Sequence, residues 1–405
     1  MKTRILALAL CLSLLLTGCE SMLHGEYLTV EPHSMLSAAE DDSSVIRVEN
    51  YQELVSGILS LVSACQEQGV IQLSNYNTRD VEADLTAACL EVSHEDPLGA
   101  YAVDYIKHEF SRILTYYQAT ITIGYRRTLE QIRSVVPVTG SSAIRGEVQG
   151  ALAQFQPEAV LRVTYFNEDE DYIRALALQA YYDTPAAAFG MPELSVAIYP
   201  DAGYQRIVEI SFTYAEPVEA LRLKSAQLQE AAREVAQPAV SRNFRGRLLL
   251  SALFGALLDH RAALEAAAPE ESGSLVPSSW PYAALVEGAP DSEALALAFQ
   301  LLCDTAGAEC TVVRGTLDGQ DHFWNIVTVD GSHRHVDASL GRDGFYLTDQ
   351  DYQALSGAEW SAEDYPACGE KNCHLSRVNA QKSKNIFYEA RMRAISSRKS
   401  CSEHR

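Results

Sequence analysis

The chain has 405 residues, of which 54 are acidic and 32 basic, so its formal net charge at neutral pH is −22. Such acidity repels phosphate backbones and argues against nucleic acid binding and against broad contact with anionic lipid. The apolar content of 47% is ordinary for a folded protein, and the length is enough for about two or three domains with separate cores.

The first 18 residues have the features of a bacterial secretion signal. Lys2 and Arg4 precede an apolar run from residue 5 to residue 16, which is too short to span a bilayer. The Leu-Thr-Gly-Cys sequence ending at Cys19 resembles the lipobox of bacterial lipoproteins, in which the cysteine is acylated and becomes the mature N-terminus. The resemblance implies an extracytoplasmic protein, anchored to the bacterial cell membrane by lipid at Cys19. The alternative is an ordinary secretion signal with a chance cysteine.

After a polar tether at residues 19–45, two segments share one predicted order of elements: helix, strand, helix and hairpin. In residues 46–130 these elements are predicted at 51–68, 70–73, 80–92 and 103–125. In residues 131–216 they are predicted at 141–154, 159–165, 172–182 and 194–214. The pattern indicates an internal repeat of two small α+β modules. Neither module gathers His, Cys or acidic residues at ligand spacing, which favours a spacer or a protein-binding platform.

The cysteines leave the disulfide pairing open. Of the nine, Cys11 falls in the signal and Cys19 at the lipid site, which leaves seven, and an odd number cannot all pair within one chain. Outside the cytoplasm three bridges are predicted as alternatives to free thiols, namely Cys65–Cys89, Cys303–Cys310 and Cys368–Cys373.

A further domain is predicted over residues 217–378, where a helical segment leads into the region richest in motifs. Residues 294–302 are nearly all apolar and contain no helix breaker, which predicts a buried helix beginning near Asp291 and Ser292. The free backbone N–H groups and the positive dipole end at such a start stabilise an anion. A nucleophile at Ser292 would benefit from both.

Two strands that follow are joined by Asp330-Gly331, a strong hairpin signal. If these two residues form the turn, Asp337 lies opposite Trp324 and diagonally across from His322 on the same face of the sheet. Such diagonal neighbours are roughly 7–8 Å apart at the backbone, close enough for a His–Asp hydrogen bond. That bond would fix the imidazole tautomer for general-base chemistry, although a surface-exposed pair is the alternative.

Taken in order, these motifs resemble the bacterial transglutaminase-like family over about residues 245–375. The matching stretches are Ala284-Leu285-Val286-Glu287-Gly288, Ser292-Glu293-Ala294-Leu295-Ala296-Leu297-Ala298-Phe299, His322-Phe323-Trp324-Asn325-Ile326-Val327 and His335-Val336-Asp337, with Tyr346-Leu347-Thr348-Asp349 and Tyr365-Pro366-Ala367-Cys368 downstream. The resemblance implies a papain-like α+β domain with a Cys-His-Asp site. By position His322 corresponds to the base and Asp337 to the acid that orients it. The nucleophile position falls on Ser292 instead of cysteine, and Ala294 replaces the usual glycine.

The serine separates two functional predictions. A thiol beside histidine and a helix start can ionise at neutral pH, whereas a serine hydroxyl needs concerted proton removal by an aligned base. Serine is also a good helix N-cap, so Ser292 is predicted to cap the helix without chemistry. The first prediction is therefore a pseudoenzyme, a binding or scaffolding protein at the cell envelope with a peptide or protein ligand in its cleft. The alternative is an acyl-transfer enzyme, a peptidase, amidase or transglutaminase-like protein, that uses Ser292, His322 and Asp337.

A metal site is a third option, because His333, His335 and Asp337 alternate along one strand with His322 across from them. Exposed strand ends often carry such residues, so neither a metal nor another cofactor is expected. The basic segment at residues 379–405 is expected to be a frayed terminus, with weak contact to an anionic surface as the alternative.

Overall fold

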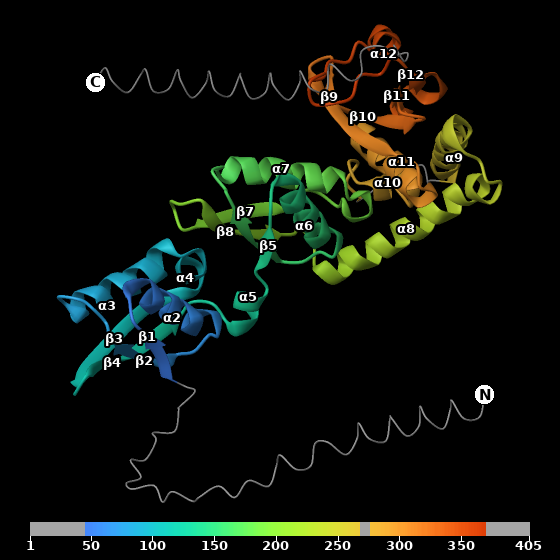
Figure 1. Ribbon diagram of the computed structural model, residues 1–405. Coiled ribbons are helices and arrows are strands. Elements are labelled where there is room, and N and C mark those ends of the chain that lie inside the picture. The colour runs from blue at the N-terminus through green and yellow to red at the C-terminus, as the bar shows by residue number, and fades with distance from the viewer. Residues whose placement is uncertain (1–44, 268–275, 370–405) are drawn as a thin grey trace, which may run out of the picture.

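The computed structural model describes residues 45–267 and 276–369. It has three four-stranded sheets with helices packed against them, arranged in a row along an elongated body (Figure 1). The predicted α+β class is therefore confirmed. The predicted signal sequence, Cys19 and the basic tail at 379–405 lie outside the described residues. Within the described ranges, no helix is both long and apolar enough to cross a membrane.

The first sheet unit, blue to teal in Figure 1, has the strand order β1-β2-β4-β3. β1 and β2 are parallel and the other pairs antiparallel. Its elements are β1 (Val45–Val48), α2 (Tyr51–Ser63), β2 (Gln68–Ser74), α3 (Val81–Leu90), a π-helical turn (Glu91–Glu95), α4 (Pro97–Ala102), β3 (Val103–Ile113) and β4 (Tyr116–Tyr125). The core forms where Leu54 and Ile58 of α2 and Leu85 of α3 pack on the sheet.

The second sheet unit, green in Figure 1, has the strand order β5-β6-β8-β7, again with only the first pair parallel. After the connecting helix α5 (Leu129–Arg133), its elements are β5 (Val136–Val138), α6 (Ser141–Ala153), β6 (Glu158–Thr164), α7 (Glu170–Tyr182), a 3-10 turn (Pro185–Ala187), β7 (Glu193–Tyr199) and β8 (Gln205–Thr213). The hairpins were predicted correctly in both units. The short parallel strands β1 and β5 were missed, because three or four residues carry no detectable alternation.

The first helix of the first unit is shorter than its apolar pattern predicted. α2 ends at Ser63, and Cys65 then has a φ of 52°, a left-handed conformation that turns the chain into β2. Phe155, with a φ of 51°, has the same place between α6 and β6. Asn75 and Tyr165 follow β2 and β6 with φ values of 54° and 59°. The two units thus turn at equivalent points as well as sharing a strand order.

The third unit, yellow to red in Figure 1, has an antiparallel sheet of order β12-β11-β10-β9. Its elements are α8 (Val218–Ser241), α9 (Gly246–Ala267), α10 (Pro281–Leu285), α11 (Ser292–Ala306), β9 (Cys310–Leu317), β10 (Gln320–Val329), β11 (Ser332–Val336), a 3-10 segment (Ala338–Gly344), β12 (Phe345–Leu347) and α12 (Asp349–Ser356). Residues 294–303 of α11 are all buried, which confirms the predicted core helix. α11 shares one core with α8, α9 and α10 and contacts β9 and β10 with its other side.

The second and third units share a hydrophobic core. Ala296 and Leu297 of α11 and Val312 of β9 pack with the α7 side of the second unit. Gln300 joins them by hydrogen bonds, donating from Nε2 to the Tyr182 carbonyl at 2.9 Å and accepting at Oε1 from the Val312 N–H at 3.1 Å. This contact brings the end of α7 to the same side of the molecule as the start of α11.

Two carboxylates lie close together where α7 and α11 end. They belong to Asp183 and Asp304. The Asp304 residue as a whole is exposed, but its carboxylate is partly buried. This burial, first, and the neighbouring Asp183, second, raise the pKa of Asp304 to about 6. Between about pH 4 and pH 6 the folded chain therefore holds a proton that the unfolded chain releases, so the free energy of unfolding falls as pH rises through this range.

We expect Asp304→Asn to flatten the dependence of stability on pH between about 4 and 6. The gain at neutral pH should stay below about 1 kcal/mol, because solvent screens the exposed carboxylate. Urea unfolding at a series of pH values measures the effect, with Asp343→Asn at an exposed position as the control. An unchanged slope in Asp304→Asn would contradict the prediction.

Candidate functional site

The hairpin β10–β11 forms in the predicted register. Asp330 and Gly331 have φ values of 51° and 67°, as a two-residue turn requires, and Val329 pairs with Ser332. The same register continues to Asn325 and Val336, so Asp337 lies just beyond the end of β11. His322 on β10 donates from Nε2 to Asp337 Oδ2 at 2.8 Å. The predicted diagonal contact is present, and it is buried instead of surface-exposed.

Asp337 is held by more groups than the sequence indicated. Besides His322, the Tyr352 hydroxyl donates to Oδ2 at 2.9 Å, and Ser339 donates to Oδ1 from its N–H at 2.9 Å and its hydroxyl at 2.6 Å. Burial and, second, Asp337 raise the pKa of Tyr352, so its hydroxyl keeps the proton that it donates. With Nε2 of His322 donating to this carboxylate, Nδ1 is the nitrogen left to act as a base.

Ser292 is the first residue of α11 but not its N-cap. Asp291 caps the helix, because its extended backbone precedes the first turn and its Oδ1 accepts the Ala294 N–H at 3.1 Å. The prediction that Ser292 is the cap was therefore wrong by one residue. Ser292 Oγ instead accepts the N–H of Phe323 on β10 at 3.3 Å. The half-buried hydroxyl thus lies against the strand that carries His322.

The structure brings two of the three predicted site residues into direct contact. His322 and Asp337 are hydrogen bonded, whereas no hydrogen bond joins Ser292 to His322 among the described residues. A serine nucleophile requires its hydroxyl to donate to the base, although such bonds can lengthen without substrate. The hydroxyl of Ser292 is beside the pair and is oriented by the Phe323 backbone.

Acidic side chains surround the start of α11. Burial, first, and the nearby Asp291 and Asp321 raise the pKa of Glu293, while the Tyr182 hydroxyl and Arg314 oppose that rise. Tyr182 comes from α7 of the second sheet unit and donates to Glu293 Oε1 at 2.9 Å. An oxyanion at this helix start would form close to the acidic side chains of Asp291 and Glu293, which weakens the stabilisation that free N–H groups provide.

The histidines of the predicted metal set do not converge on one point. His322 bonds to Asp337, while His333 Nδ1 lies 3.1 Å from Thr328 Oγ1. His335 is fully buried, accepts the Trp324 indole N–H at Nδ1 at 2.9 Å and contacts Asp349 Oδ1 through Nε2 at 2.8 Å. Each imidazole thus has its own partner.

A different group, His335, Asp349 and Cys368, has ligand atoms within 4.8 Å of one another. The Trp324 N–H leaves Nδ1 of His335 unprotonated, so the proton of the neutral ring lies on Nε2, the nitrogen that would have to bind a metal. Burial raises the pKa of Cys368 to about 12, so its thiol keeps its proton. These protons make the group a hydrogen-bonded cluster and a poor metal ligand set.

Two connected cavities lie beside the site. One of about 320 Å³ is lined by Asp321 and Phe323 next to His322, and by Arg314, Asp364 and Tyr365. The last three residues also line a cavity of about 540 Å³ that extends between β9 and the helices α6 and α7 of the second unit. The two cavities share these three residues and are together called the β9 groove, which runs from the second sheet unit to Asp321 and Phe323 on β10.

The outer edge of β9 along this groove is already hydrogen bonded. The Val312 N–H donates to Gln300 Oε1 at 3.1 Å, and the Arg314 N–H donates to the Tyr365 hydroxyl at 3.1 Å. The Thr316 N–H donates to the Glu359 carbonyl at 2.8 Å. A peptide in the groove therefore cannot pair with these groups as a fifth strand. Recognition would depend on side chains.

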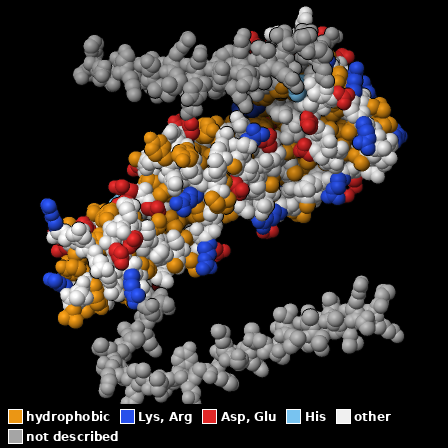
Figure 2. Space-filling model, viewed as in Figure 1, with side chains coloured by type: hydrophobic (Ala, Val, Ile, Leu, Met, Phe, Trp, Pro, Cys, Tyr) orange, Lys and Arg blue, Asp and Glu red, His pale blue; other side chains and the backbone are white. Residues whose placement is uncertain are grey.

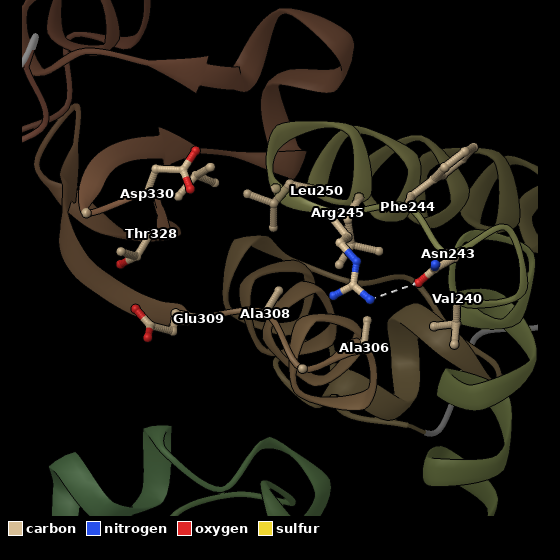
Figure 3. A pocket seen from close by; sticks show the side chains of 15 residues that line it. Val240, Asn243, Phe244, Arg245, Leu250, Ala306, Ala308, Glu309, Thr328 and Asp330 are labelled. Carbon is tan, nitrogen blue, oxygen red and sulfur yellow. Dashed lines mark hydrogen bonds between the residues drawn. The ribbon is translucent and has the colours of Figure 1, made fainter.

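A further cavity of about 530 Å³ lies at the opposite end of the third sheet unit (Figure 3). Arg245 enters from the α8–α9 connection and bonds to Asn243 Oδ1 at 3.2 Å, while Glu309 and Asp330 lie on the opposite wall. The 15 residues of α11, about 22 Å at the helical rise, separate this cavity from Ser292. It is therefore not part of the Ser292–His322–Asp337 site.

The site residues that the sequence did not predict come from distant elements. Tyr352 is on α12 and Tyr182 is on α7, 110 residues before Ser292 along the chain by their numbers. Neither position carries a local pattern that relates it to the hairpin. Ser339 lies in the 3-10 segment that follows β11.

No protein-family model matches this sequence, and no curated protein matches it. Among solved structures, the chain is similar to one described as "Crystal structure of a TGase", with 12% sequence identity over 63% of this chain and 66% of that chain. The match therefore spans slightly less than two thirds of that chain, and its TM-score is 0.23. A TM-score of this size carries no argument about fold or activity.

Proposed function

We propose that the third sheet unit is a transglutaminase-like domain that binds a ligand without transforming it. The family is supported by the ordered motifs and by the buried His322–Asp337 bond at the positions of base and orienting acid. The observation that carries the non-catalytic role is the bonding of Ser292, whose Oγ accepts the Phe323 N–H and has no bond to His322 within the described ranges. The carboxylates around Ser292 support the same conclusion, because they disfavour an oxyanion.

We further propose that the protein is anchored to the cell membrane and that the two preceding units act as spacers. The basic-then-apolar leader and the Leu-Thr-Gly-Cys sequence support a lipid anchor at Cys19, which places the folded chain at the outer face of the cell membrane. The shared strand order and the equivalent turns at Cys65 and Phe155 support an internal duplication. In this arrangement the two units hold the ligand-binding domain away from the bilayer.

The proposed ligand is a peptide-like segment with cationic side chains. The β9 groove ends beside Asp321, and Glu293 and Asp291 lie at the start of α11. The groove is also lined by Arg314, which lies over the Tyr182 ring at 5.4 Å, and by Arg145, which pairs with Asp183 at 2.6 Å. On the face drawn in Figure 2, acidic and basic side chains are interspersed with apolar ones, without a broad basic surface that would suit nucleic acid.

We expect short lysine-containing peptides to raise the thermal midpoint of the full chain more than glutamate-containing peptides of equal length. The physical reason is the excess of carboxylates beside the β9 groove. Asp321→Asn should weaken the affinity for the lysine-containing peptides about two- to fivefold, as the loss of one exposed charge pair implies, and should therefore reduce the shift. Asp343→Asn, at an exposed position that does not line the groove, is the matched control. Equal shifts for both peptide classes would contradict a cationic ligand.

The alternative function is acyl transfer by Ser292. The observation that favours it is the support of Asp337 by Tyr352 and Ser339, which gives His322 the fixed orientation that a general base needs. In that mechanism His322 Nδ1 would remove the Ser292 proton as the hydroxyl attacks a carbonyl carbon, and it would then protonate the leaving group.

We expect a fluorophosphonate probe to leave Ser292 unmodified in the folded chain, because the serine lacks a bond to its base and the carboxylates oppose the developing negative charge. Mass spectrometry of the peptide containing residue 292 checks this, with His322→Ala as the variant in which no specific labelling can occur. A His322-dependent adduct at Ser292 would establish the enzyme and would remove the binding proposal.

A further inference from the structure

The end of α11 turns two cysteines toward each other. Gly307 has a φ of 69° and ends the helix, and the N–H of Ala308 donates to the Cys303 carbonyl at 2.8 Å. The chain therefore reverses within a few residues and enters β9 at Cys310. This reversal brings the first residue of β9 alongside the last turn of the helix.

The two thiols are neighbours inside the third sheet unit. Cys303 belongs to the core that α11 forms with its neighbouring helices, and Cys310 packs against the same core. Burial, first, and then the nearby Cys303 thiol raise the pKa of Cys310. Cys303 is fully buried, and the Asn325 side chain on β10 also contacts Cys310. Cys89 differs, because burial is the sole cause of its raised pKa, and no contact to Cys65 contributes. Of the predicted pairs, Cys303–Cys310 is therefore the one whose side chains are neighbours, and Cys373 lies outside the described residues.

We infer that Cys303 and Cys310 are an oxidisable pair that forms an intramolecular disulfide by exchange with an external disulfide. One cysteine thiolate attacks the external disulfide, whose S–S bond breaks and releases one thiolate. The second cysteine thiolate then attacks the resulting mixed disulfide, forms the Cys303–Cys310 bond and releases the second thiolate. The two protons lost by the cysteines go to the two released thiolates. The chain is oxidised by two electrons, and the external disulfide is reduced.

The bond would fix the helix that carries Ser292 to the sheet that carries His322. Ser292 begins α11 and Cys303 is in its last turn, while β9 pairs along its length with β10. The crosslink would also hold residues 306–309, which form one wall of the cavity in Figure 3. Because Cys303 is buried and Cys310 partly buried, exchange should occur while the chain folds or during transient opening of the α11 end.

The test is an exchange experiment on the full chain. The chain is unfolded in urea, refolded in glutathione buffers from fully reduced to fully oxidised, treated with iodoacetamide and digested without reduction. We expect a peptide pair linked through Cys303 and Cys310, lighter by about 2 Da than the two reduced peptides. We also expect the oxidised chain to unfold roughly 5 °C higher than the reduced chain. Cys310→Ser should remove both effects.

The same digests contain the control. Cys65 and Cys89 should be recovered as alkylated thiols under the conditions that link Cys303 to Cys310. If Cys310→Ser does not fold, the digests of the unaltered chain still decide the question. Recovery of alkylated Cys303 and Cys310 at every glutathione ratio, or linkage of either one to another cysteine, would overturn the inference.

Discussion

Ser292→Cys is expected to give the domain a reactive thiol. The residue is at the start of α11, where the helix dipole and free N–H groups favour an anion, and its side chain lies against the strand of His322. A thiol reaches further than a hydroxyl and is a stronger acid, so it can give its proton to His322 Nδ1. Asp337 would stabilise the imidazolium that results. We expect the thiol introduced by Ser292→Cys to react with iodoacetamide about tenfold faster at pH 7 than an ordinary exposed thiol.

The matched control is Ser361→Cys, which introduces an exposed thiol on the rim of the β9 groove. Rates for both variants are measured by mass spectrometry of the peptides that contain the substituted positions, so the native cysteines do not interfere. In Ser292→Cys/His322→Ala the rate should fall to that of Ser361→Cys. If the thiol of Ser292→Cys reacted no faster than that of Ser361→Cys, His322 would not be positioned to activate residue 292. The transglutaminase-like assignment of the site would then be lost.

We do not expect the Ser292→Cys variant to cleave or transfer amides efficiently, even though its thiol should be reactive. The tetrahedral intermediate places a negative charge near the first N–H groups of α11, where Asp291, Glu293 and Asp321 are close. The serine at position 292 and the acidic surroundings therefore act in one direction, against acyl transfer and toward the binding of cationic groups.

Local signals predicted the part of the site that depends on local geometry. Asp330-Gly331 fixed the register of β10 and β11, and the register alone determines that His322 and Asp337 are diagonal neighbours. The unbroken apolar run predicted α11 in the same way. Both features lie within a single hairpin or a single helix, where residues close together in the sequence are also close together in space.

The parts that were missed depend on contacts between distant segments or on small differences in energy. Tyr352 reaches Asp337 only because α12 packs back against the sheet, and Tyr182 reaches Glu293 only because the second unit packs on α11. The N-cap was misplaced because Asp291 and Ser292 are caps of nearly equal quality, so the choice depends on backbone direction.

Asp337→Ala is expected to be the most destabilising single change at the site. The substitution leaves the His322 Nε2–H, the Tyr352 hydroxyl and the Ser339 hydroxyl without their acceptor. Asp337 is only 1% exposed, so water does not readily replace it. Each buried donor left unpaired costs about 1–3 kcal/mol, although water entering the space recovers part of this. We therefore expect the free energy of unfolding to fall by about 3–5 kcal/mol.

Urea unfolding followed by tryptophan fluorescence measures this loss, since the Trp324 ring stacks on His322 with ring centres 5.8 Å apart. Tyr352→Phe removes one donor and keeps the ring, so its loss should be about 1 kcal/mol. Asp343→Ala removes an exposed carboxylate and should change stability by less than about 0.5 kcal/mol. If Asp337→Ala were as mild as Asp343→Ala, the carboxylate would not be the acceptor that holds His322, and neither the binding cleft nor an acyl-transfer site could depend on that pair.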